Sequence, residues 1–269
     1  MKFNLKSLLT IITAASALVL SGCGEKTADN QKIKVGVMAG AEAQVAEVAK
    51  KVAKDKYDLD VELVTFTDYV TPNAALDDGS VDVNAFQHKP YLDQQIADRG
   101  YKLAIAGNTF VYPIAGYSKE VKSVDEIKEG SRIAVPNDPT NLGRSLLLLQ
   151  KQGLIKLREN VGLKATVQDI VENPKNIDVV ELDAAQLPRS LDDVTVAIIN
   201  NSFASQIDLS PNKDGIFVED KDSPYVNLIV AREDNVNNEN VKNFVKAYQT
   251  EEVYQAAMKT FKDSVVKGW

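Results

Sequence analysis

The sequence of 269 residues contains one cysteine and one histidine. A single cysteine cannot form a disulfide within the chain, and the two residues together are too few for a structural zinc site. Any Ser-His-Asp triad would have to use His88. Positive charge is also scarce, because 31 Lys+Arg against 38 Asp+Glu give a net charge of −7. Nucleic acid is therefore excluded as the expected main partner, since binding phosphates needs a basic surface.

Long apolar runs are nearly absent, and the one that matters lies close to the start of the chain. It extends from Leu8 to Leu20 and follows Lys2 and Lys6. Its 13 residues are too few to span a bilayer, which takes about 20. They match the apolar core of a secretory signal.

This run ends at a small-residue pair followed by the single cysteine, Cys23, a pattern typical of lipoprotein signal cleavage. We expect residues 1–22 to be a signal peptide and Cys23 to carry acyl chains such as palmitate. The polar residues 23–32 are expected to form a flexible tether. The alternatives are an ordinary secreted protein in which the cysteine is incidental, and a cysteine buried in the core.

After residue 32, short apolar runs alternate with amphipathic stretches, which predicts an α/β protein with a mostly parallel sheet. Two such sets of elements predict two lobes with a cleft between them, and ligands of such sheets bind beyond the carboxyl ends of strands. Strands are expected at 33–37, 61–64, 81–83, 111–117, 132–135, 177–182, 194–199 and 227–231. Helices are expected at 42–54, from about 90, at 123–130, at 141–152 and within 239–262.

The stretch 135–144 is the most informative for function. We place Arg144 in the first turn of a buried helix, where the helix dipole disfavours a cation. Gly143 beside it costs about 1 kcal/mol relative to alanine within a helix. Both features make sense if the helix end and the guanidinium hold a carboxylate, with Gly143 allowing close approach. The alternative is that Asp138 or another acid pairs with Arg144 for structural reasons, and the residues alone do not decide between the two.

Two asparagines stand at or within predicted strands. Asn200 follows the strand 194–199, and Asn227 lies inside the strand 227–231, where asparagine is uncommon. Their amide oxygens could accept hydrogen bonds from a ligand ammonium, and the alternative for each is an amide hydrogen-bonded within the fold.

Aromatic side chains and the single histidine gather around the strand near residue 83. Aromatic edges attract a thioether by about 0.3–1.5 kcal/mol each, so these side chains could form one wall of a binding cleft. The alternative is that the aromatics belong to the core and the histidine is structural. The candidate residues are Tyr69, Phe86, His88 and Tyr91.

Four stretches of the sequence closely resemble the MetQ/NlpA lipoproteins, the substrate-binding proteins of methionine ABC importers. They are VDVNAFQHKPYL (81–92), NTFVYPIAGYS (108–118), VPNDPTNLGR (135–144) and SPYVNLIV (223–230). The resemblance extends from the signal sequence to the final Lys-Gly-Trp at 267–269.

This resemblance implies a two-lobed periplasmic-binding-protein fold, similar to type II, in which two chain crossovers form the hinge. Lobe 1 would comprise 33–111 plus 229–269, and lobe 2 would comprise 112–228. Arg144 would hold the carboxylate of methionine. The polar partners would be Asn141, Asn200 and Asn227, and the side-chain pocket would be lined by Tyr69, Phe86, His88 and Tyr91.

The resemblance further implies a non-enzymatic receptor that is held to a membrane through its lipid anchor alone and faces the periplasm. It would need no cofactor or metal. It would capture L-methionine, with D-methionine as a second candidate, and deliver it to the permease and ATPase subunits of an ABC importer. The alternatives are a binding protein for a methionyl dipeptide or another small amino acid, an envelope-tethered hydrolase using His88, and a structural lipoprotein without transport.

Overall fold

The computed structural model describes residues 31–220 and 223–269. The predicted signal peptide (1–22), Cys23 and residues 23–30 of the predicted tether lie outside the described residues. In the part of the chain that is described, no helix combines the length and the apolar character needed to cross a membrane.

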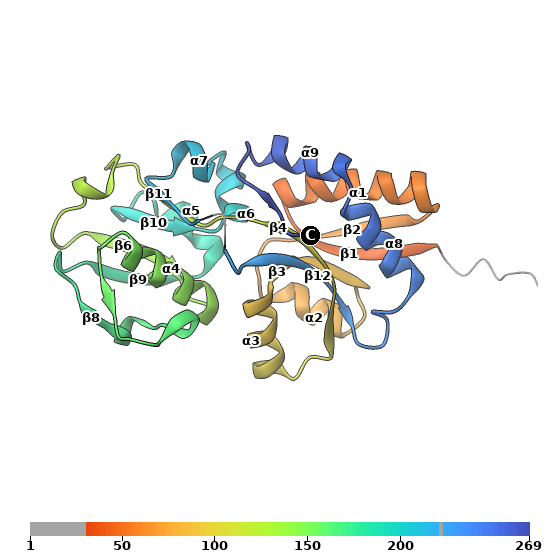
Figure 1. Ribbon diagram of the computed structural model, residues 1–269, viewed down its shortest axis with the longest axis horizontal. Coiled ribbons are helices and arrows are strands. Elements are labelled where there is room, and N and C mark those ends of the chain that lie inside the picture. Colours follow the sequence, from red (N-terminus) through yellow and green to blue (C-terminus); the bar gives the residue numbers. More distant parts are fainter. Residues whose placement is uncertain (1–30, 221–222) are drawn as a thin grey trace, which may run out of the picture. The chain divides into compact units, whose positions relative to one another are not determined.

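A six-stranded mixed sheet forms the centre of lobe 1, the name used here for the part of the fold built on this sheet (Figure 1). The strand order is β13-β4-β12-β3-β1-β2. β1 is parallel to β2 and β3, whereas β12 runs antiparallel between β3 and β4, and β13 is antiparallel to β4. The strands are β1 (Lys32–Met38), β2 (Asp60–Phe66), β3 (Val83–His88), β4 (Leu103–Val111), β12 (Val226–Arg232) and β13 (Val266–Lys267).

Helices cover both faces of this sheet. Successive residues of β12 alternate between two hydrophobic clusters, Leu228 and Val230 in one and Ile229 and Ala231 in the other, so the clusters lie on opposite faces. One cluster is shared with α1, α8 and α9 and the other with α2 and α3. The helices are α1 (Ala41–Tyr57), α2 (Thr71–Asp77), α3 (Lys89–Arg99), α8 (Glu239–Tyr248) and α9 (Glu251–Thr260).

A five-stranded sheet in the order β11-β5-β10-β6-β9 forms the centre of lobe 2. β6 is parallel to β9 and β10, whereas β5 is antiparallel to β10 and β11. Val196 and Ile198 of β10 face a core shared with α4, and Ala197 and Ile199 face a core shared with α5 and α6. The strands are β5 (Ala115–Tyr117), β6 (Arg132–Pro136), β9 (Asp178–Leu182), β10 (Val196–Ile199) and β11 (Phe217–Val218).

The remaining elements of lobe 2 are short, apart from α4. The helices are α4 (Pro139–Lys151), α5 (Leu187–Ser190), α6 (Asn201–Ala204) and α7 (Pro211–Asp214), and a separate hairpin joins β7 (Lys156–Leu157) to β8 (Ile170–Glu172). Five 3₁₀ turns lie among the described residues: η1 (Val124–Glu126), η2 (Gly162–Lys164), η3 (Val167–Asp169), η4 (Ala184–Gln186) and η5 (Ser205–Ile207).

The prediction of a mostly parallel sheet was wrong, because each large sheet is parallel on one side and antiparallel on the other. The mixture arises because the chain leaves lobe 1 after β4, builds lobe 2 and returns as β12.

The predicted lobe boundaries stay a prediction, since contacts group residues 31–269 into one compact unit. The boundary at 228/229 falls inside β12, all of which belongs to the first sheet.

Two strand predictions also need correction. β3 begins at Val83 and continues to His88, whereas the sequence pattern placed its end at 83. The predicted strand 111–117 is two strands, since β4 ends at Val111 and β5 starts at Ala115 in the other sheet. The predicted helix at 123–130 is only the 3₁₀ turn η1.

Candidate functional site

A cavity with about 340 Å³ of empty volume opens between residues of the two lobes. This volume includes space that is open to solvent, and all the residues that line the cavity are polar or aromatic. The structure brings all eight candidate side chains to this one cavity, although they come from stretches up to 158 positions apart (227 − 69). They are Tyr69, Phe86, His88, Tyr91, Asn141, Arg144, Asn200 and Asn227.

Aromatic rings form the wall on the lobe 1 side. Phe86 lies in β3, Tyr91 in the first turns of α3, and Tyr69 between β2 and α2. The ring centres of Tyr69 and Phe86 are 5.8 Å apart, and those of Phe86 and Tyr91 are 6.0 Å apart at near right angles. The Tyr91 hydroxyl donates to the carbonyl of Tyr69 at 2.7 Å. These rings also belong to a hydrophobic cluster, so they are core residues and cavity wall together.

His88 ends β3 and caps the N-terminus of α3. Its Nδ1 accepts a hydrogen bond from the backbone N–H of Tyr91 at 3.2 Å, and its Nε2 lies 3.2 Å from Oδ1 of Asn141. Because Nδ1 acts as an acceptor, the neutral ring carries its proton on Nε2 and donates to Asn141. Burial, and then the charge of Arg144, lower the pKa of His88 to about 3. The imidazole is therefore neutral at physiological pH.

Asn141 connects the histidine to lobe 2. Its Oδ1 accepts from His88 and also from Nδ2 of Asn200 at 3.0 Å. Its own Nδ2 donates to Asp138 at 2.8 Å, and Asp138 also accepts from the backbone N–H of Asn141 as the N-cap of α4. A chain of hydrogen bonds thus fixes these amides in orientation.

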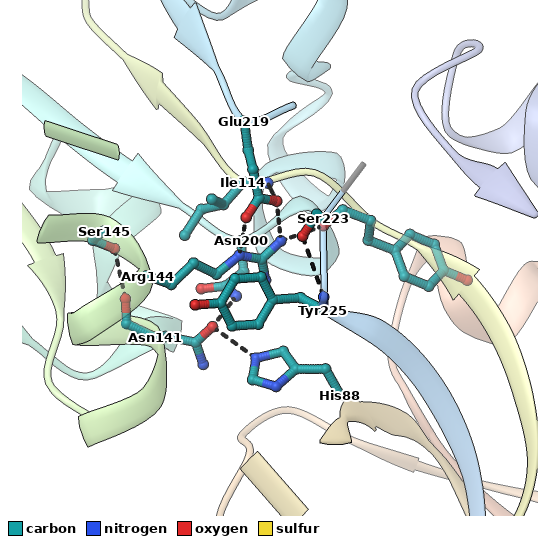
Figure 2. Close-up of polar contacts among 10 residues, drawn as sticks. His88, Ile114, Asn141, Arg144, Ser145, Asn200, Glu219, Ser223 and Tyr225 are labelled. Carbon is teal, nitrogen blue, oxygen red and sulfur yellow. Dashed lines mark hydrogen bonds and ion pairs between the residues drawn. The ribbon is translucent and has the colours of Figure 1, made fainter. Parts of the chain in front are cut away.

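Arg144 has an internal counter-ion, as the structural alternative raised from the sequence allowed. Nε donates to Oε1 of Glu219 at 2.8 Å, and Nη2 donates to Oε2 of the same carboxylate. Nη2 also donates to the carbonyl of Tyr112 at 3.0 Å. Figure 2 shows Arg144 between Glu219 and the ring of Tyr225, whose centre lies 4.3 Å from Cζ. The acid is Glu219 rather than Asp138, and the role of Arg144 in holding a ligand carboxylate stays a prediction.

The ion pair leaves part of the guanidinium available. Arg144 is only 4% exposed and lines the cavity. Of its five N–H donors, Nε and both on Nη2 are used, whereas the two on Nη1 have no hydrogen-bond partner within residues 31–220 and 223–269. A buried guanidinium with two free donors beside a cavity can still hold an anion.

Gly143 serves packing, which corrects the expectation that it admits a ligand. A Cβ at this position would lie 2.3 Å from the carbonyl oxygen of Leu163, so the glycine lets α4 approach the η2 turn. Arg144 is also further along the helix than predicted. α4 starts at Pro139, so Arg144 falls in the second turn and feels less of the helix dipole.

The two remaining asparagines differ in how well they are satisfied. Asn227 donates from Nδ2 to the carbonyl of Phe86 at 2.9 Å, so it ties β12 to β3. Asn200, the residue after β10, is 7% exposed, and its Oδ1 is buried with no hydrogen-bond partner among the described residues. A buried unpaired carbonyl oxygen costs about 1–3 kcal/mol, which a ligand donor would remove.

Sequence reasoning missed four further lining residues and the acid. The lining residues are Gln87, Tyr112, Asn201 and Ser202. Asn201 and Ser202 directly follow Asn200, so the rule that sites lie beyond strand ends would have found them. No sequence signal would have identified Glu219, because it is 75 positions from Arg144 and precedes further charged residues.

Comparison with known proteins agrees with this fold. The sequence matches the NlpA lipoprotein family over residues 33–269. It is 77% identical over 269 residues, all of both chains, to a probable D-methionine-binding lipoprotein MetQ of Vibrio cholerae.

Two solved structures are also similar. An ABC-transporter periplasmic substrate-binding protein from Coxiella burnetii has 49% identity and a TM-score of 0.86, over 88% of this chain and 100% of that one. A nutrient-binding protein from Burkholderia cenocepacia bound to methionine has 51% identity and a TM-score of 0.86, over the same shares. The fold described above is the mixed α/β two-domain fold of these substrate-binding proteins, and the chain belongs to the NlpA lipoprotein family.

Proposed function

We propose that this protein captures methionine in the cavity between its lobes and delivers it to an ABC importer. The observation that carries the proposal is that one cavity holds both unpaired hydrogen-bond donors and an unpaired acceptor. Arg144 offers two free N–H donors and Asn200 a buried oxygen without a donor. An amino acid supplies a carboxylate for the first and an ammonium for the second.

In this arrangement the ligand carboxylate binds Nη1 of Arg144, while Glu219 keeps the guanidinium in place from its other edge. The ammonium donates to Oδ1 of Asn200, with Asn227 and Asn141 as further polar groups of the cavity. The thioether lies against Tyr69, Phe86 and Tyr91, whose rings attract sulfur by about 0.3–1.5 kcal/mol each. The names of the similar proteins, several of which refer to methionine, support this ligand.

Ligand capture is coupled to closure of the lobes. His88 of lobe 1 donates to Asn141 of lobe 2, and the ring of Tyr69 packs on that of Phe203 with centres 4.8 Å apart. A ligand that contacts both walls favours the closed arrangement, because it interacts less well when the lobes part. The closed form would then be what a membrane permease recognises.

The protein acts as a receptor and not as an enzyme. His88 cannot serve as a base in this geometry, because its Nδ1 already accepts from a backbone N–H and its pKa of about 3 makes it a poor proton acceptor. Lipid attachment at Cys23 would hold the protein to a membrane with residues 31–269 on the extracytoplasmic side. The similarity to a protein called an ABC-transporter periplasmic substrate-binding protein supports this placement.

Titration calorimetry with a set of methionine analogues tests the proposal. We expect L-methionine to bind and the methionine amide, which lacks the carboxylate, to bind at least about 30-fold more weakly, the loss of one buried charge-assisted contact. D-methionine and glycyl-methionine measure the tolerance of the site. Mass spectrometry after incubation should recover methionine and the dipeptide intact. Equal binding of methionine and its amide, or cleavage of the dipeptide, would refute the proposal.

A further inference from the structure

A buried acid lies at the contact between the lobes, next to the cavity but outside its lining. Glu42, in the first turn of α1, is 2% exposed. Its Oε1 accepts a hydrogen bond from the hydroxyl of Ser202, which belongs to α6 of lobe 2 and lines the cavity. The contact therefore joins a carboxyl of one lobe to the ligand-facing wall of the other.

Further contacts cross between the lobes at the same place. Nε2 of Gln206 donates to the carbonyl of Ala39 at 3.2 Å, just before α1 begins. Tyr69 of lobe 1 packs against Phe203, the neighbour of Ser202. If the lobes part, all these contacts break together, and the carboxyl of Glu42 is released from Ser202 into water.

Among the residues that the structure describes, the groups around Glu42 supply no positive charge. Its titratable neighbours are three tyrosines: Tyr69 before α2, Tyr112 after β4 and Tyr248 in α8. Burial raises the pKa of each of these hydroxyls, so they stay neutral. A carboxylate enclosed by neutral groups is costly, and burial, only partly offset by the Ser202 hydroxyl, raises the pKa of Glu42 to about 8.

We propose that closure of the lobes around the ligand takes up one proton on Glu42, so that ligand capture and protonation of this carboxyl favour each other. The proposal rests on the proposed function only in assuming that methionine favours the closed arrangement. It assigns to Glu42 a positioning role: as a neutral acid it holds Ser202 and the adjoining cavity wall against lobe 1.

The direction of the pH effect follows from the two states. In the open arrangement Glu42 would titrate near 4.5, the ordinary value, and in the closed arrangement near 8. Between these values closing requires a proton, so methionine affinity falls as pH rises, by at most about tenfold per pH unit. His88 shifts in the opposite sense, to about 3, and so acts only below about pH 6.5.

The test is the number of protons taken up when methionine binds at pH 7.5. Calorimetry in phosphate and in Tris, whose ionisation enthalpies differ, gives this number directly. At this pH His88 is neutral in both states. We expect the unmodified protein to take up about three-quarters of a proton more than Glu42→Gln, which mimics the neutral acid. Across pH 6–8.5 its affinity should fall, while that of Glu42→Gln should change much less.

Two further variants make the result decisive. Glu47→Gln, which changes an exposed acid on the same helix, should leave the proton number unchanged. Ser202→Ala removes the hydroxyl that lowers the pKa of Glu42 and should shift the pH midpoint upward, which keeps the test available if Glu42→Gln does not fold. If methionine binds and the number of protons taken up is the same in the unmodified protein and in Glu42→Gln, this inference is overturned while the proposed function stands. Absence of methionine binding in the unmodified protein would instead refute the proposed function.

Discussion

The two walls of the cavity are built in different ways. On the lobe 2 side, Asn141, Arg144 and Asn200 are each held by hydrogen bonds to other side chains, with Asp138 and Glu219 supplying the negative charge behind them. On the lobe 1 side, the wall consists of rings that contact one another at centre distances of about 6 Å. One wall is fixed mainly by hydrogen bonds between side chains, whereas in the other ring packing is the main contact and the Tyr91–Tyr69 hydrogen bond adds to it.

This difference indicates how the site would divide recognition. Directional bonds hold donors and acceptors in fixed positions, so the lobe 2 wall suits the invariant part of an amino acid, its carboxylate and ammonium. Ring packing is less demanding in geometry, so the lobe 1 wall suits a flexible, polarisable side chain. Substitutions on the lobe 2 wall should therefore reduce affinity, whereas substitutions on the lobe 1 wall should mainly alter selectivity.

Replacement of the cation should have the largest effect on binding. Arg144→Met removes the proposed partner of the ligand carboxylate, and we expect methionine affinity to fall about 30- to several-thousand-fold, or about 2–5 kcal/mol. It also leaves the carboxylate of Glu219 without its counter-ion. The double variant Arg144→Met/Glu219→Gln should therefore be more stable than Arg144→Met but should bind methionine no more tightly. Arg158→Met, at an arginine that pairs with Asp169 near β8, is the matched control. Calorimetry that finds methionine affinity unchanged in Arg144→Met would contradict the assignment of the ligand carboxylate to the lobe 2 wall.

Loss of the unpaired amide oxygen should have the next largest effect. Asn200→Leu removes the proposed acceptor for the ligand ammonium and should weaken methionine binding by about 1–3 kcal/mol, roughly 5- to 150-fold. The analogue that lacks the amino group should lose much less. If both ligands weaken equally, Asn200 shapes the wall without contacting the ammonium.

A change in the aromatic wall should alter selectivity more than affinity. Phe86→Leu removes one ring edge from the side-chain pocket and should reduce the preference for methionine over norleucine by about 0.3–1.5 kcal/mol. Phe244→Leu, at a residue of α8 that belongs to the buried core of lobe 1, is a control that should lower stability and leave the preference intact. A preference for methionine that survives in Phe86→Leu would show that sulfur does not contact this ring.

Gly143→Ala should leave affinity nearly unchanged. The added methyl group would meet the carbonyl of Leu163 at 2.3 Å, so α4 and η2 must separate, which we expect to lower the free energy of unfolding by about 1–3 kcal/mol. Urea denaturation measures the stability and calorimetry the affinity. A large loss of affinity with unchanged stability would restore a ligand-binding role for this glycine.

Much of the fold and the cavity lining could be predicted because the signals are local. Helical spacing predicted α1, and the end of the apolar strand before Asn200 predicted that this residue lies at the site. Asn141 was identified only through the resemblance to the MetQ/NlpA lipoproteins. Phe86 and His88 were expected to follow a strand but lie within β3. The boundary of β3 was misplaced because Asn84, Gln87 and His88 look like loop residues. Asn84 and Gln87 are instead satisfied by each other and by Asn73 inside lobe 1.

The long-range pairings could not be predicted. Glu219 and Arg144 are 75 positions apart, and Glu42 and Ser202 are 160 apart. In the sequence each of these acids looks like an ordinary solvent-exposed charge among others. They become buried only when the folded chain brings distant segments together, and the spacing of residues in a sequence does not predict which distant groups will meet.

The central position of β12 constrains the order in which the polypeptide can acquire its structure. This strand lies between β3 and β4, yet about 115 residues separate it from β4 along the chain (226 − 111). A nascent chain that has emerged only as far as β11 has a gap in the middle of its first sheet, whereas every strand of the second sheet is already present. The intervening lobe is therefore free to fold first, and the lobe that contains the N-terminal strands must finish last.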